Sequence, residues 1–147
     1  MKIVNQQAKF DYEIKDRVEA GMVLTGAEAK SAKSGAVDLS RAFCKVSSSK
    51  FKAQEVWVHN LHIYPYKHAD NAEYDPKRAR KLLLHQKEII SLLSRMKQSR
   101  LLLVPTAIYT RSGMVKLEIG LARGKRIYEK REAIKKRDLD RDMEREF

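Results

Sequence analysis

Hydrophobic and polar residues alternate with a period of two along most of this 147-residue chain, from its start to about Tyr66 and again up to Ala122. A period of two is that of a β-strand with one buried face, so the pattern predicts a domain built mainly from strands. A stretch in the middle has a helical period instead. We therefore expect a mainly β domain with added helices and with strands at 10–14, 22–25, 39–47, 55–59, 61–66, 101–109 and 115–121.

Two helices are predicted within this pattern. The first covers residues 27–33 and ends before Gly35, because glycine accepts the left-handed backbone found just past a helix end. The second covers residues 76–100, with Asp75 as its cap and Pro76 at its first position. The rest of this central helix is strongly basic, and its apolar face is expected to consist of Leu82, Leu83, Ile89, Ile90, Leu93 and Met96.

The chain carries a large positive charge. Its 31 Lys and Arg residues outnumber 19 Asp and Glu residues, which gives a net charge of +12. Such a charge attracts polyanions, so nucleic acid, an anionic membrane surface and an acidic protein are the candidate partners. The sequence has neither a secretory signal nor an apolar run long enough to cross a bilayer, and we expect a cytoplasmic protein.

No residue cluster predicts catalysis, a cofactor or a metal. Cys44 is the only cysteine and lies in a strand-like run, which favours a structural role. His59 and His62 are three residues apart and would face opposite sides of a strand, so they do not predict a metal site. Glu19 and Glu28 belong to separate elements and do not predict a catalytic carboxylate pair.

Several residues favour nucleic-acid binding. Arg78, Arg80 and Lys81 are expected to contact backbone phosphates. Side chains that stack on unpaired bases or hydrogen-bond to RNA lie near predicted strand ends: Tyr12, Asn60, His62, Tyr64 and Tyr66. The alternative is structural, because Lys-rich helices are often only solvated and tyrosines in strands usually belong to the core.

The composition changes after Gly124. Residues 123–137 carry eight basic and two acidic side chains, whereas residues 138–147 carry two basic and five acidic ones. Too few apolar residues follow to form a second core, and we expect a tail that is mobile in the free protein and becomes helical on a partner. Leu139, Met143 and Phe147 would then form a narrow apolar stripe. The alternative is a tail that stays disordered.

Six ordered strings of the sequence resemble the small protein B family, the bacterial partners of transfer-messenger RNA. They are NQQA at 5–8 with Tyr12, EAG at 19–21, LTGAEAKS at 24–31, NLHIYPY at 60–66, DPKRARKLLLH at 75–85 and GLARGKR at 120–126. The resemblance implies a closed β-barrel of the oligonucleotide-binding (OB) type with added helices over residues 1–122. Residues 123–147 would be a ribosome-interacting tail, disordered or helical.

The resemblance also implies a function, that of a non-enzymatic RNA-binding adaptor of trans-translation. The barrel would bind the tRNA-like domain of transfer-messenger RNA and deliver it to stalled ribosomes, while the tail occupies the vacant decoding site and mRNA channel and contacts ribosomal RNA. Elongation factor Tu would be a partner only indirectly, through the RNA. No membrane partner is implied, and we expect a monomer.

The family motifs place the RNA contacts on Tyr12, Glu19, Lys30, Asn60, Arg80, Lys81, Leu83 and His85. In this interpretation Arg80 and Lys81 neutralise phosphates, and Tyr12 and His85 stack or hydrogen-bond. Glu19 accepts a hydrogen bond from RNA, or instead pairs with a neighbouring lysine. The tail contacts would be Gly124, Lys125, Arg126, Glu129, Lys130 and Arg131.

Two other functions remain open at the level of sequence. One is a general barrel protein that coats single-stranded nucleic acid, and the other is an RNA-processing enzyme. A preference among RNAs that survives added salt separates the adaptor from the coating protein, because pure phosphate binding weakens steeply with salt. Turnover of an RNA would indicate the enzyme.

Overall fold

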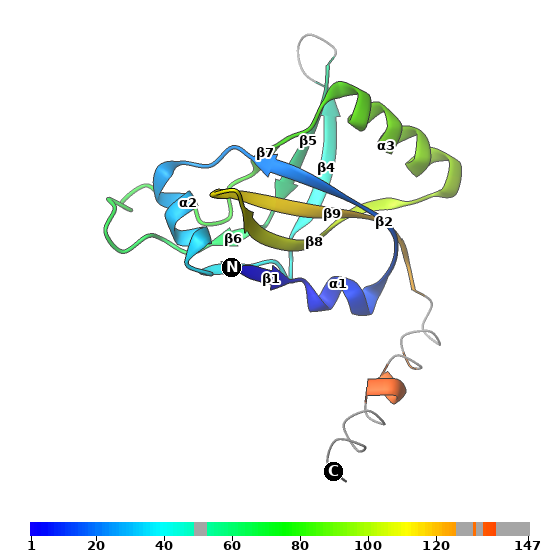
Figure 1. Cartoon of the computed structure of the whole chain (residues 1–147), viewed down its shortest axis with the longest axis horizontal. Coiled ribbons are helices and arrows are strands. Elements are labelled where there is room, and N and C mark those ends of the chain that lie inside the picture. Colours follow the sequence, from blue (N-terminus) through cyan, green and yellow to red (C-terminus); the bar gives the residue numbers. More distant parts are fainter. Residues whose placement is uncertain (49–52, 126–130, 132–133, 138–147) are drawn as a thin grey trace.

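The computed structural model describes residues 1–48, 53–125, 131 and 134–137 (Figure 1). Within them a curved antiparallel sheet forms the body, and three helices lie around it. The elements in chain order are β1 (Lys2–Val4), α1 (Gln6–Asp11), β2 (Tyr12–Met22), α2 (Gly26–Lys33), β3 (Val37–Asp38), β4 (Phe43–Ser48), β5 (Gln54–His59), β6 (His62–Ile63), β7 (Arg80–Leu83), α3 (Gln86–Ser99), β8 (Leu102–Arg111) and β9 (Met114–Gly124).

The seven strands of the main sheet follow the order β1-β8-β9-β2-β7-β5-β4, and β3 pairs with β6 in a separate two-stranded sheet. All of these pairings are antiparallel. The predicted mainly β class with added helices is therefore confirmed. The core lies inside the curve of the sheet and is made largely of strand residues with α2 and α3 against it.

The predicted closure of the barrel is wrong for the described residues, where β1 and β4 remain the two edges of the sheet. The physical reason lies at β8. Its second half is paired with β1, while its first half faces β4 across a gap lined by side chains rather than bridged by backbone hydrogen bonds. The gap holds a pocket of about 220 Å³ between Phe43 and Cys44 on β4 and Leu103 and Val104 on β8, with Met96 of α3 beside it.

The β8–β9 hairpin agrees closely with its prediction. Strands expected at 101–109 and 115–121 appear as β8 and β9, and the turn at Ser112 and Gly113 has φ values of 52° and 76°. The expected strand at 55–59 is β5, and the expected short helix is α2, with Gly35 at φ 88° after its end. Local patterns were sufficient for these elements.

The central helix was predicted to begin too early. Residues 76–79 instead form a turn and loop, and Arg80–Leu83 form β7, in which Arg80 and Leu82 are buried and alternate with Lys81 and Leu83. This strand pairs with β5 on one side and β2 on the other, and that pairing overrides helix propensity. Asp75 caps a turn by accepting the Lys77 N–H at 3.0 Å, and the helix begins only at Gln86.

Other predicted bounds also differ. Residues 10–14 span the end of α1 and the start of β2, because buried Asn5 caps α1 by accepting the Ala8 N–H at 3.1 Å. The strand expected at 22–25 is absent because Thr25 caps α2 in a reciprocal arrangement with Glu28. The strand expected at 39–47 begins only at Phe43, and that at 61–66 is reduced to β6.

Candidate nucleic-acid interface

A buried ion cluster holds the helix α2 against the strand β7. The Glu28 side chain is fully buried and accepts hydrogen bonds from Arg80 Nε at 2.7 Å and from Arg78 Nε at 3.1 Å. Arg80 is also fully buried and donates to the Leu61 carbonyl at 2.6 Å and to the Tyr74 hydroxyl at 3.1 Å. This cluster fixes the position of α2 and of the loop that precedes β7.

The charges in this cluster stabilise one another. Burial by itself would raise the pKa of the Glu28 carboxyl, but hydrogen bonds from Arg78, the Thr25 backbone and Arg80 outweigh burial and lower that pKa to about 2. The prediction that Arg80 neutralises RNA phosphates is wrong for this structure, since its guanidinium is enclosed by protein acceptors. Sequence reasoning missed this role because Glu28 lies 52 positions earlier.

Three predicted contact residues lie on the surface around β2 and β7. Leu83 is 52% exposed, and its side chain lies 3.5 Å from the position that a β-carbon on Gly21 would take. Lys116 reaches the same spot from β9. Lys81, the neighbour of Leu83, is half-buried and pairs with Glu55 at 3.4 Å. His85 is exposed at the start of α3.

Glu19 faces outward from β2 and pairs with Arg111 of the β8–β9 hairpin at 2.8 Å. Its partner is therefore an arginine rather than the lysine that the sequence suggested. The Arg111 side chain is 68% exposed, whereas that of Glu19 is 29% exposed. Tyr109 lies beside the pair, and burial followed by the nearby Glu19 carboxylate raises the pKa of its hydroxyl. A hydrogen-bond donor from solvent can compete with Arg111 for this carboxylate.

Lys30 and Asn60 lie in the region of α2 and β6. Lys30 is exposed, with its ammonium 5.7 Å from the centre of the Tyr66 ring. Asn60 joins β5 to β6 with a left-handed φ of 57° and helps to line a pocket of about 370 Å³. The other residues that line this pocket are Asp38, Ser40, Arg41, His62 and Lys77.

Tyr12 lies apart from these residues, at the opposite end of β2 from Glu19 and Gly21. It is partly buried and packs with Ala8, Val104 and Ala122.

Cys44, in the nearby gap between β4 and β8, is half-buried, and burial raises its thiol pKa to about 12. A thiol with such a pKa stays protonated at neutral pH, as expected of a structural cysteine.

The tail contacts are described only in part. Lys125 follows β9 directly and donates from its backbone N–H to Asp11 at 2.9 Å and from Nζ to the Lys9 carbonyl at 3.0 Å. Arg131 and residues 134–137 have helical backbone, and the prediction that the tail becomes helical on a partner stays a prediction. Arg126, Glu129, Lys130, Leu139, Met143 and Phe147 lie outside the described residues.

The structure also reveals basic residues that sequence reasoning missed. Arg41 and Lys77 line the pocket beside Asn60, and Lys2, Lys9 and Arg17 line another near α1. The alternation of β2 places Arg17 and Glu19 on one face, and this alternation is the signal that could have identified Arg17. None of the helices in the described parts of the chain has the length and apolar character needed to cross a bilayer.

Comparison with known proteins gives consistent matches over nearly the whole chain. A family model described as SmpB protein matches residues 2–147. An SsrA-binding protein of Desulfitobacterium hafniense (strain DSM 10664 / DCB-2) is 42% identical over 143 residues, which cover 97% of this chain and 88% of that protein. An SsrA-binding protein of Sulfurihydrogenibium sp. (strain YO3AOP1) is 45% identical over 143 residues, which cover 97% of this chain and 91% of that protein.

A solved structure described as "tmRNA-SmpB: a journey to the center of the bacterial ribosome" contains a chain of similar fold. The two chains are 40% identical and superpose with a TM-score of 0.68. The similarity covers 90% of this chain and 94% of the other. Sequence and fold therefore point to the same family.

Proposed function

We propose a function from one premise: the chain belongs to the SmpB family. It acts as an RNA-binding adaptor of trans-translation and not as an enzyme. It binds the tRNA-like domain of transfer-messenger RNA and brings that RNA to stalled ribosomes in the cytoplasm. The observation that carries this proposal is the similarity, at 40% identity and a TM-score of 0.68, to a structure described by its tmRNA, SmpB and ribosome.

The proposed RNA surface is built around Glu19 and Leu83. Leu83 offers an exposed apolar side chain for a ribose or base, and Lys116 supplies a positive charge beside it. Glu19 accepts a hydrogen bond from RNA, and this bond replaces its ion pair with Arg111. Lys81 and His85 extend this surface along β7 and into the start of α3. Arg80 supports it from beneath through Glu28 and makes no phosphate contact.

The proposed domain division separates RNA binding from ribosome binding. Residues 1–122 hold the RNA, and the tail from 123 onwards occupies the empty decoding site and mRNA channel. Its basic part, residues 123–137, suits ribosomal RNA because it has eight basic residues and two acidic ones. The strand β9 continues to Gly124 and pairs there with Tyr12, so the first residues of the tail complete the sheet, and a truncation that leaves the sheet intact ends at Lys125. The chain acts as a monomer and reaches elongation factor Tu only through the RNA.

Equilibrium binding tests the RNA part of this proposal. The purified chain is titrated with the tRNA-like domain, elongator tRNA and single-stranded DNA, each at two salt concentrations. The adaptor prefers the tRNA-like domain, and the preference persists at the higher salt because shape-specific contacts add to phosphate contacts. Equal binding to all three, lost together as salt rises, would favour a general coating protein instead.

A further inference from the structure

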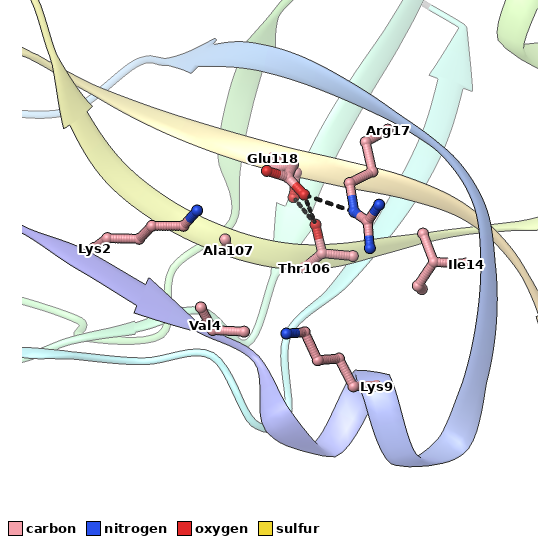
Figure 2. Close-up of a pocket in the computed structure, with 8 residues that line it drawn as sticks. All are labelled: Lys2, Val4, Lys9, Ile14, Arg17, Thr106, Ala107 and Glu118. Atoms are coloured by element: carbon pink, nitrogen blue, oxygen red, sulfur yellow. Dashed lines mark hydrogen bonds and ion pairs between the residues drawn. The ribbon is translucent and has the colours of Figure 1, made fainter.

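A pocket of about 300 Å³ lies between α1 and the outward face of β1, β8, β9 and β2 (Figure 2). Thr106 and Ala107 of β8 are both buried beneath it. Gly120 of β9 lies close by, and a β-carbon there would meet methyl groups of Ile14 and Thr106 at 2.9 Å. Glycine at position 120 therefore lets Ile14 and Thr106 pack against the β9 backbone, and these two side chains line the pocket.

Three cationic side chains surround the pocket, and each comes from a different element. Lys2 belongs to β1, Lys9 to α1 and Arg17 to β2 (Figure 2). Within the described part of the chain, no carboxylate lies within ion-pair distance of the Lys2 or Lys9 ammonium. Both ammonium groups are therefore available to an anion.

The single carboxylate of the pocket is already engaged. Glu118 Oε1 accepts from Arg17 Nε at 3.0 Å and from Thr106 Oγ1 at 3.0 Å (Figure 2). This contact uses the Nε of Arg17 and leaves its two terminal nitrogens for another acceptor. The Arg17 side chain is 55% exposed, so those nitrogens are accessible from solvent. With three cations and one anion, the pocket has a net charge of +2.

A phosphate group fits this donor set. It presents several acceptor oxygens and no donor, and a guanidinium with two ammonium groups can bind different oxygens at once. Val4, Ile14 and Ala107 provide apolar surface next to the charges, suitable for the sugar attached to a phosphate.

We propose that this pocket binds one backbone phosphate of the RNA, with the attached ribose against Val4 and Ile14. The inference rests on the proposed function and adds a specific contact to it. Arg17 and Glu19 lie two residues apart on β2, and Glu118 is the register partner of Glu19 on β9. An RNA strand that contacts Glu19 therefore reaches the pocket within about one nucleotide.

The test measures binding of the tRNA-like domain over a range of salt concentrations. The double variant Lys9→Gln/Arg17→Gln should bind about tenfold more weakly, and its plot of log K against log salt should be shallower by about 0.7 to 0.9, the contribution of one phosphate. Lys97→Gln on α3 is the matched control, because Lys97 is exposed and outside the pocket. It should retain the wild-type slope.

The variant Glu118→Gln should change RNA affinity in the opposite direction. It removes the only negative charge of the pocket while keeping an oxygen that accepts from Thr106 and Arg17. RNA affinity should therefore rise about threefold or more, whereas a residue with a merely structural role would leave affinity unchanged or lower it. Unchanged or lower affinity in a folded Glu118→Gln variant contradicts the phosphate assignment.

The outcomes separate this inference from the proposed function. If the wild-type chain does not prefer the tRNA-like domain, the proposed function is overturned. The phosphate contact is then still tested by measuring how the pocket variants bind another RNA that the wild-type chain binds. A wild-type preference with pocket variants that behave like Lys97→Gln overturns the inference alone. In a separate arm, adenosine 5′-monophosphate and inorganic phosphate are titrated while the amide signals of Arg17 and Ala107 are followed. Saturable binding of these small ligands would assign the pocket to a free nucleotide or phosphate if, in addition, the Lys9→Gln/Arg17→Gln variant keeps the wild-type salt dependence of RNA binding. That result overturns the RNA contact.

Discussion

Arg80 donates from Nε to Glu28 Oε2 at 2.7 Å, and both side chains are completely buried. The pair connects α2 to β7 across 52 positions of sequence and is completed by Arg78 and Tyr74. An intact buried pair of this kind changes the free energy of folding little, but either ion left unpaired in the interior is strongly destabilising. The proposed RNA surface on β7 therefore depends on an ion pair that is shielded from solvent.

Removal of one member of this pair should destabilise the fold. We expect Arg80→Met to lower the free energy of unfolding by about 3 kcal/mol, because the buried Glu28 would lose one of its two arginines and the Leu61 and Pro76 carbonyls would lose a donor. Urea unfolding followed by circular dichroism measures the change. Arg95→Met is the matched control, since Arg95 forms an exposed pair with Asp16 and should cost about 1 kcal/mol or less. An Arg80→Met variant as stable as the control but with weakened RNA binding would restore the phosphate role.

The same pair should make stability depend on acid. The folded-state pKa of Glu28 is about 2, below the ordinary value of 4.5, so its contribution is fully present above pH 4.5 and is lost as the pH falls toward 2. The loss amounts to about 3 kcal/mol. Carbon-13 NMR of the Glu28 carboxyl provides the direct measurement, with a midpoint near pH 2 expected in the folded chain. A midpoint near 4.5 would show that the arginines do not stabilise the carboxylate.

The Glu19 variant distinguishes an RNA contact from a structural ion pair. Glu19→Ala should weaken binding of the tRNA-like domain about tenfold, the effect of one hydrogen bond to a charged group. Its free energy of unfolding should change by about 1 kcal/mol or less, because the pair with Arg111 is at the surface. Glu13→Ala is the control on the same strand, since Glu13 also pairs with an arginine, Arg123. Equal RNA affinities for the two variants would assign Glu19 a structural role.

Tail truncation tests the proposed division of labour. A chain that ends at Lys125 keeps β9 complete and should bind the tRNA-like domain within about threefold of the full chain, yet support no tagging on stalled ribosomes. A chain that ends at Arg137 keeps the basic part of the tail and removes the acidic residues 138–147. Comparison of the two in a tagging assay locates the active segment. A large loss of RNA affinity in the shorter chain would contradict the division.

The sequence predicted best the elements whose signals are local. The β8–β9 hairpin has alternation on both strands and a Ser112-Gly113 turn, and α2 has a helical run that ends before Gly35. The β7 strand was missed because its pattern also fits a helix, and only its pairing with β2 and β5 decides between them. Barrel closure was beyond local patterns as well, since it depends on how closely β4 approaches β8.

The candidate site shows the same limit. Leu83, His85, Lys30 and Asn60 were found from motifs and are on the surface in the structure. Arg80 was misassigned because its burial is visible only once Glu28 is placed beside it. Lys2, Lys9 and Arg17 come together from three elements, and no motif links them in sequence. The proposed RNA roles of the surface residues remain predictions.

Reconstituted rescue of a stalled ribosome tests the adaptor role most directly. Ribosomes stalled at the end of a truncated message are supplied with aminoacylated transfer-messenger RNA and elongation factor Tu, with or without this chain, and addition of the encoded tag to the stalled peptide is measured. The adaptor function predicts tagging only when the full chain is present, and none with the chain that ends at Lys125. Equal tagging with and without the full chain would contradict the adaptor function.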